Sequence, residues 1–196
     1  MNLNKPNSLY ISFFILSFYM RLFIAFEASK EVSEYLKTVQ KEFFKSKVQL
    51  NLTKTFHLTL KFLGEVDDKK LDDVKEAFKQ IRFEPFVAKL TKLGAFPDTR
   101  NPKVLWVGLD PAEKIREFHK QVDEKLSQLF DPETKFEPHI TLARVKFINH
   151  AKSFQERYEE LKTEKMTFLV DKIKLIQSRP TKEGHVYEDV ESVDLQ

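Results

Sequence analysis

The chain has 196 residues, of which 41% are hydrophobic and 13% aromatic, so it can fill the core of one ordinary domain or of two lobes that share a core. Its 33 Lys and Arg residues against 30 Asp and Glu leave a net charge of +3, which permits an anionic partner without requiring one. The absence of Cys excludes disulfides, thiol catalysis and cysteine-ligated metal sites, and the four scattered glycines exclude a Walker loop or a GxGxxG fingerprint.

The chain opens with an apolar run. Residues 9–20 (LYISFFILSFYM) carry no charge, a length that suits the core of a signal peptide and is too short to span a bilayer. Arg21 interrupts the run, and no small-residue cleavage site follows it. Translation that begins at Met20, a membrane or export segment, and an additional packed arm are three interpretations that the sequence leaves open. We assign 1–19 to an N-terminal extension and 20–196 to a single two-lobed domain.

The remainder of the chain alternates between strand and helix patterns. Strands are predicted, from period-two alternation and β-branched or aromatic content, over 21–28, 48–52, 54–63, 85–93, 104–109, 139–147, 166–176 and 186–193. Helices are predicted, from apolar residues at helical spacing, over 29–46, 67–81, 111–129 and 149–161. The strands mostly come in pairs, which favours antiparallel sheets covered by helices on one side and hence an α+β fold.

Two short motifs share one pattern of residue types. The sequences HLTL and HITL begin at His57 and His139, and each lies in a predicted strand. A pair of such motifs is expected by chance in about one chain in a thousand of this composition. Because alternate side chains share a face of a strand, His57 and Thr59 lie on one face, as do His139 and Thr141.

The paired motifs indicate chemistry at phosphorus. If a pseudo-twofold axis relates the two halves, two imidazoles and two hydroxyls meet in one cleft. One imidazole can then act as a base and the other as an acid, while the hydroxyls donate to phosphoryl oxygens. The alternative is that each His is a structural strand residue, which we would favour for one motif but not for two. The other histidines lack Thr partners and zinc-like spacing, so we expect no catalytic metal and no cofactor.

These motifs and their surroundings resemble the 2H phosphoesterase superfamily, and more closely its 2′-5′ RNA ligase / RNA 2′,3′-cyclic phosphodiesterase family. The matching segments are MRLFIAFE (20–27), FHLTLKFLGEV (56–66), LGAFPDTRNPKVLWVGL (93–109) and FEPHITLARVK (136–146). The resemblance covers about 20–190. It implies two pseudo-symmetric lobes, each an antiparallel sheet with helices on its outer side, that face a central cleft.

The resemblance also implies an activity and a role for each motif residue. The activity is hydrolysis of a terminal RNA 2′,3′-cyclic phosphate to a 2′-phosphomonoester, or attack on it by a 5′-hydroxyl to give a 2′-5′ linkage. His57 is then the proton donor to the departing 3′ oxygen, and His139 is the proton acceptor that activates water. Thr59 and Thr141 hold the phosphate.

Three further residues are predicted to bind substrate. Arg144, in HITLAR, would clamp the phosphate with two hydrogen bonds, although strand parity places it on the face opposite the motif His unless a bulge redirects it. Lys61 shares the face of the first motif His and would add positive potential. Trp106 would stack a nucleobase. Each has a structural alternative, as a surface Arg, a solvated Lys or a core Trp, and parity favours core packing for Phe62.

The predicted partner is RNA that ends in a 2′,3′-cyclic phosphate, tRNA fragments included, and we expect a cytoplasmic monomer without membrane contact. Two other functions stay open. One is a 2H phosphodiesterase for 2′-5′ oligonucleotides or small cyclic nucleotide derivatives, and the other is a non-catalytic RNA-binding module. The abundance of Lys and Glu with no Cys is typical of heat-adapted proteins.

Overall fold

The computed structural model describes residues 19–182 and 184–196. The helices of these ranges are α1 (Lys30–Phe44), α2 (Asp68–Lys79), α3 (Ala112–Lys125) and α4 (Ala151–Glu160). The strands are β1 (Tyr19–Glu27), β2 (Val48–Leu52), β3 (His57–Asp67), β4 (Phe86–Phe96), β5 (Val104–Asp110), β6 (His139–Ile148), β7 (Thr167–Val170), β8 (Lys172–Thr181) and β9 (Gly184–Asp194). The prediction of an extension over 1–19 concerns residues that, apart from Tyr19 in β1, lie outside the described ones.

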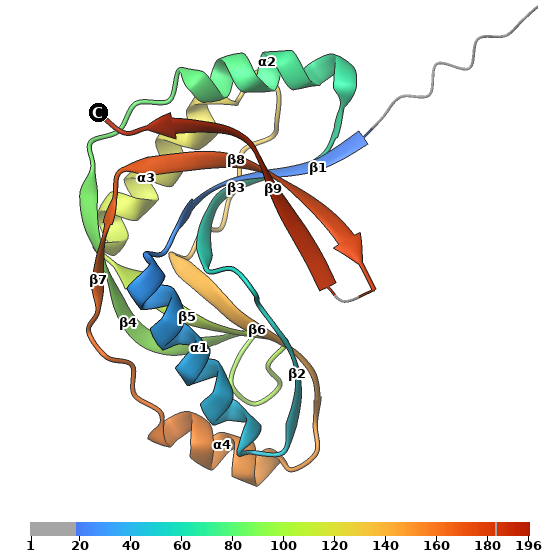
Figure 1. The fold of residues 1–196 in the computed structure, drawn as a ribbon, viewed down its shortest axis with the longest axis vertical. Helices are drawn as coiled ribbons and strands as arrows, with labels where there is room; N and C mark the ends of the chain where they lie inside the picture. The colour runs from blue at the N-terminus through green and yellow to red at the C-terminus, as the bar shows by residue number, and fades with distance from the viewer. Residues whose placement is uncertain (1–18, 183) are drawn as a thin grey trace, which may run out of the picture.

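The strands form two sheets in which every pair is antiparallel (Figure 1). One sheet has the order β3-β1-β8-β9 and the other the order β2-β6-β5-β4-β7. The two motif strands, β3 and β6, belong to different sheets and pack against each other. This arrangement confirms the predicted α+β fold of two antiparallel lobes that meet at a cleft.

The helices cover the outer sides of the sheets because each has one apolar face. In α1, which Ser29 caps, Val32, Leu36 and Val39 are buried, and the helix packs against β2 and β6. Helices α2 and α3 pack together and cover β3 on the other lobe (Figure 1). The helix that follows β1 therefore supports the second motif strand, and the helix that follows β5 supports the first.

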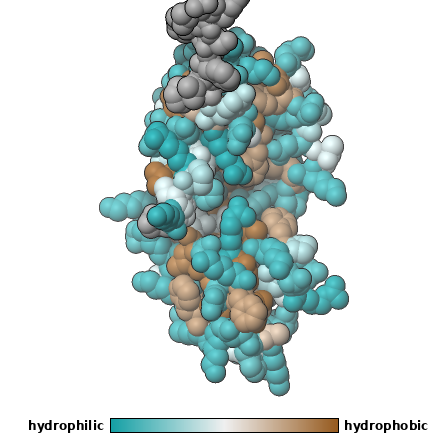
Figure 2. Space-filling model, turned by 90° about the vertical axis from the view of Figure 1, so that its right-hand side faces the viewer, coloured by the Kyte–Doolittle hydropathy of each residue, from teal (hydrophilic) through white to brown (hydrophobic). Residues whose placement is uncertain are grey.

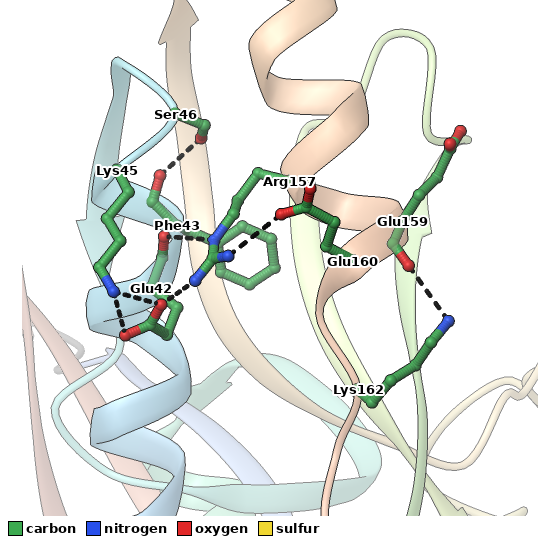
Figure 3. Close-up of polar contacts among 8 residues, drawn as sticks. All are labelled: Glu42, Phe43, Lys45, Ser46, Arg157, Glu159, Glu160 and Lys162. Carbon is green, nitrogen blue, oxygen red and sulfur yellow. Dashed lines mark hydrogen bonds and ion pairs between the residues drawn. The ribbon is translucent and has the colours of Figure 1, made fainter.

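Helix α4 is fastened to α1 by ion pairs. Arg157 of α4 contacts the carboxylate of Glu42, and its Nε also lies 3.4 Å from the Glu42 carbonyl oxygen (Figure 3). Lys45 pairs with the same carboxylate at 2.7 Å, and Glu160 pairs with Arg157 at 3.3 Å. Beneath these charges, the rings of Phe43 and Phe154 stack at 6.3 Å between centroids. These contacts hold α4 against α1, the helix that packs on β2 and β6.

The main hydrophobic core takes side chains from both sheets and all four helices. A second, smaller cluster of Phe23, Ala25 and Ile176, with Tyr187 against it, lies on the other face of the four-stranded sheet. That sheet is therefore apolar on both faces near its centre. Within 19–182 and 184–196, no helix is long and apolar enough to cross a membrane.

The segment predicted as one strand over 166–176 is two strands. β7 ends at Val170 and pairs with β4, whereas β8 begins at Lys172 and pairs with β1. The chain changes sheets at Asp171, whose carbonyl accepts a hydrogen bond from the Leu195 amide at 2.7 Å. A continuous apolar run does not reveal such a change, because both strands bury the same types of side chain.

Candidate active site

Both motif strands carry a β-bulge at the fourth residue of the motif. In β3, Ile24 pairs with Lys61 and Ala25 with Thr59, so Leu60 is the extra residue. In β6 the extra residue is Leu142. A bulge shifts the alternation of side chains by one position. The first and third residues of each motif keep the same face, but the residues after the bulge change sides.

Each bulge carbonyl is bonded to a buried polar side chain of a helix. Gln40 of α1, only 3% exposed, donates from Nε2 to the carbonyl of Leu142 at 2.7 Å. On the other lobe His119 of α3, 7% exposed, has Nδ1 at 2.7 Å from the carbonyl of Leu60. A carbonyl oxygen only accepts, so Nδ1 of His119 carries the proton. The two motif strands are thus supported in equivalent ways, each by one buried polar side chain of a helix.

The two motifs meet in a cavity of about 830 Å³ between the lobes. His57 and Thr59 line it from β3, and His139 and Thr141 line it from β6. The four motif side chains that the alternation placed on two strand faces thus face one space. Two imidazoles and two hydroxyls around one cavity can bind a phosphate and exchange protons with it.

The His139 imidazole is oriented by the backbone just before its strand. Its Nδ1 lies 2.7 Å from the carbonyl oxygen of Glu137, so Nδ1 carries the proton and Nε2 of the neutral ring has a free lone pair. Phe96 packs edge-on against the ring at 5.0 Å between centroids. Burial lowers the pKa of His139, while the hydrogen bond to Glu137 and the charge of that carboxylate oppose the shift. The ring is therefore neutral near pH 7 and presents a base.

The His57 imidazole lies among aromatic rings. Phe23 is 5.0 Å away between centroids, and Tyr187 meets it edge-on at 5.3 Å. Burial, with a smaller contribution from the nearby His139, lowers the pKa of His57 to about 4. Near pH 7, His57 therefore holds a proton only when an anion lies beside it, because a negative charge offsets the effects of burial and of the second imidazole.

Cationic side chains give the cavity a positive potential. Arg21, Lys135 and Arg144 line it, and within the described residues none of them pairs with a carboxylate. The two carboxylates of the lining are engaged elsewhere: Glu133 accepts from the amide of Phe62 at 3.1 Å, and Glu137 pairs with Arg116 at 3.3 Å. Unpaired guanidinium groups beside two hydroxyls favour an anionic ligand.

The bulges explain where the residues after each motif lie. Arg144 faces the cavity because the bulge in β6 reverses the parity that would have turned it away. Phe62 occupies the equivalent position of β3, so it is 61% exposed at the cavity and does not pack in the core as predicted. Lys61, predicted to face the substrate, is correspondingly turned inward and is 1% exposed.

The inward Lys61 fastens the loop before β6. It forms an ion pair with Asp123 of α3 and donates to the carbonyl of Asp131 at 2.9 Å. The other carboxylate oxygen of Asp123 accepts from the Glu133 amide at 3.1 Å, and the Phe136 ring stacks on His119 at 4.0 Å. We therefore revise the role of Lys61 from contact with substrate to support of the loop that ends at His139.

Trp106, predicted to stack a nucleobase, does not line the cavity. It is 8% exposed and packs beside His139, with 5.8 Å between ring centroids. A Cβ placed on Gly94 would come within 2.1 Å of the indole, so this glycine makes room for it. The indole Nε1 is buried and has no hydrogen-bond partner among the described residues. Trp106 is the register partner of Thr141, so it packs beside the second motif on the same face of the sheet.

The sequence patterns did not indicate the contribution of the β8–β9 hairpin. Ser178, His185 and Tyr187 also line the cavity. His185 and Tyr187 stand two residues apart on one strand, a spacing that could have drawn attention to their shared face, but no motif accompanies it. In the part of the chain that the structure describes, no group of three or more His, Asp or Glu side chains is placed to hold a metal ion.

Comparison with known proteins agrees with this geometry. The model of the LigT-like phosphoesterase family matches residues 24–106 and again 107–187. The RNA 2′,3′-cyclic phosphodiesterase of Methanocaldococcus jannaschii is 35% identical over 171 residues, which cover 86% of this chain and 97% of that protein. The enzyme of the same name from Archaeoglobus fulgidus is 32% identical over 174 residues, 87% of this chain and 98% of its own length.

Solved structures with the same fold cover nearly the whole chain. The crystal structure of TT0787 from Thermus thermophilus matches with a TM-score of 0.76 and 26% identity, over 90% of this chain and 98% of that one. The structure of Escherichia coli LigT complexed with 3′-AMP matches with a TM-score of 0.70 and 22% identity, over 91% and 99%. Because the family model matches each half of the chain once, and each half supplies one His-x-Thr strand to the cavity, this chain belongs to the LigT-like phosphoesterase family.

Proposed function

We propose that the chain is an RNA 2′,3′-cyclic phosphodiesterase that opens a terminal cyclic phosphate to a 2′-phosphomonoester. The observation that carries the proposal is the meeting of two His-x-Thr strands in one cavity with unpaired cations. The curated relatives from Methanocaldococcus and Archaeoglobus, which align over most of this chain, carry the name of that activity. The cavity is electropositive and partly apolar, as a nucleotide with a charged end requires.

The proposed reaction moves one proton through each imidazole. His139 accepts a proton from water at Nε2, and the water oxygen attacks phosphorus. The bond from phosphorus to the 3′ oxygen breaks in line, and His57 donates its proton to that oxygen. The product carries a 3′-hydroxyl and a 2′-phosphate. A 5′-hydroxyl in place of water would give a 2′-5′ linkage by the same transfers.

The assignment of base and acid is supported by the hydrogen bonds. The carbonyl of Glu137 fixes the Nδ1 proton of His139, which leaves Nε2 as the acceptor. No hydrogen bond holds the His57 ring within 19–182 and 184–196, so it can take up a proton when the anionic phosphate enters. Thr59, Thr141 and Arg144 would hold the phosphoryl oxygens between the two rings.

Incubation of an RNA with a 2′,3′-cyclic phosphate end, in the presence of EDTA, tests the proposal. The expected product is the 2′-phosphomonoester, and an RNA that already has an open 2′-phosphate serves as the control and stays unchanged. A protein that binds both RNAs and alters neither would be an RNA-binding module. Activity that disappears in EDTA and returns with a divalent cation would contradict the two-imidazole mechanism.

A further inference from the structure

The β8–β9 hairpin brings a third histidine to the cavity. The Tyr187 ring lies 5.3 Å from the His57 ring, and the His185 ring is nearly parallel to Tyr187, at 6.2 Å and 13°. The three rings form a series that leads from the proposed reacting centre along β9 toward the end of the hairpin, which projects from the body of the molecule (Figure 1). Figure 2 looks onto that side and shows hydrophobic side chains lying among hydrophilic ones.

The outer ring of this series is held in place. Ser178 on β8 is 7% exposed, and its Oγ lies 2.9 Å from Nδ1 of His185. Ser178 is the register partner of Tyr187, so the hairpin itself fixes the spacing of the two rings. An aromatic ring that is already ordered loses little conformational freedom when a nucleobase stacks on it. The hairpin thus offers a preorganised stacking surface next to the catalytic residues.

A second cation lies beside this surface. Arg21 and Arg144 line the same cavity as Tyr187. Burial raises the pKa of Tyr187, and the charges of these two guanidinium groups oppose that shift. A terminal 2′,3′-cyclic phosphate carries one negative charge, for which Arg144 on the motif strand β6 suffices. Arg21, on β1 and without a carboxylate partner among the described residues, is therefore available for a second phosphate.

We propose that Arg21, Ser178, His185 and Tyr187 form a binding site for the nucleotide that precedes the cyclic phosphate. Its base stacks on His185, and the phosphodiester that joins it to the terminal nucleotide contacts Arg21. The cavity of about 830 Å³ is near the upper end of the range for sites that hold one drug-sized ligand, ~300–1,000 Å³, and has room for this second unit. The site rests on the proposed function and makes the enzyme selective for chain ends over free mononucleotides.

The experiment compares kcat/KM for cytidine 2′,3′-cyclic phosphate with that for a dinucleotide that has the same cyclic end. We expect wild-type protein to favour the dinucleotide by about tenfold or more, the scale of one base-stacking contact. His185→Ala should lower the dinucleotide value by about tenfold and leave the mononucleotide value within about twofold. Arg21→Gln should lower the dinucleotide value by about tenfold more than it lowers the mononucleotide value. Turnover of the mononucleotide also shows that each variant is folded.

Two matched variants serve as controls. Val186→Ala alters the neighbouring residue on β9, which is 45% exposed and outside the cavity lining. Arg179→Gln removes the same charge as Arg21→Gln from the hairpin, at a side chain that pairs with Glu188 outside the cavity. Both controls should keep the wild-type preference for the dinucleotide.

Three results would overturn the inference, and they are distinguishable. Equal losses on both substrates with His185→Ala and Arg21→Gln would place these residues at the terminal nucleotide. Equal kcat/KM of the wild-type protein for both substrates would show that no such site operates, while the proposed function stands. Absence of turnover on both substrates would reject the proposed function and the site together.

Discussion

Acidification tests the burial of His57. The pKa of this imidazole is about 4 in the folded protein, against an ordinary value near 6.5 in the unfolded chain. Between these values the unfolded chain binds a proton that the folded protein does not, so the free energy of unfolding falls as the pH falls from 6.5 to 4. At about 1.36 kcal/mol per pH unit, the full window corresponds to about 3 kcal/mol.

The assay is urea unfolding of the wild-type protein and of His57→Gln at pH 7 and at pH 4.5. Other groups also titrate in this range, but they are common to both proteins. The wild-type protein should therefore lose about 2–3 kcal/mol more than the variant on acidification. Inorganic phosphate should reduce the difference, because an anion in the cavity stabilises the protonated ring. Equal losses in the two proteins would show that His57 is not held neutral by burial.

Three further predictions concern the catalytic pair and its supports. His57→Ala and His139→Ala should each lower turnover by about 10²-fold or more. A substrate whose leaving group needs no proton should restore the turnover of His57→Ala but not that of His139→Ala. If it restores the turnover of His139→Ala instead, the acid and base roles are exchanged. Gln40→Leu removes a donor from the bulge carbonyl of β6 and should lower the free energy of unfolding by about 1–3 kcal/mol, whereas an unchanged urea midpoint would deny that support. Lys61→Met removes the ion-pair partner of the Asp123 carboxylate, which is only 12% exposed, and should lower the free energy of unfolding by about 3–5 kcal/mol. The additional change Asp123→Asn should recover part of this loss if charge is the cause.

The alternation of side chains was sufficient to place the first and third residues of each motif in one cavity. It failed after the fourth residue, where the bulges at Leu60 and Leu142 reverse the parity. The predictions for Lys61 and Phe62 were wrong for that reason, and the same reversal turns Arg144 toward the cavity. The carbonyl of each extra residue bonds to a helix side chain, that of Gln40 or His119, and these contacts join residues far apart in sequence.

The order of strands and helices was predicted nearly throughout, because each element carries its own period of apolar residues. The division of 166–176 into two strands depends on which neighbours the strands find, and residue types do not encode that. The hairpin residues Ser178 and His185 escaped notice for a related reason, since they reach the cavity only through the pairing of β8 with β9.

The single residue that separates β7 from β8 has a consequence for the catalytic cycle. Asp171 joins a strand of one sheet to a strand of the other, and one extended residue spans only about 3.3 Å. This short connection limits how far the two lobes can separate, so we expect the cleft to change little in width while substrate enters and product leaves. Enzymes that close around their substrates are often limited by reopening. In this protein the proton transfers themselves should set kcat, so a solvent isotope effect should be visible at saturating substrate.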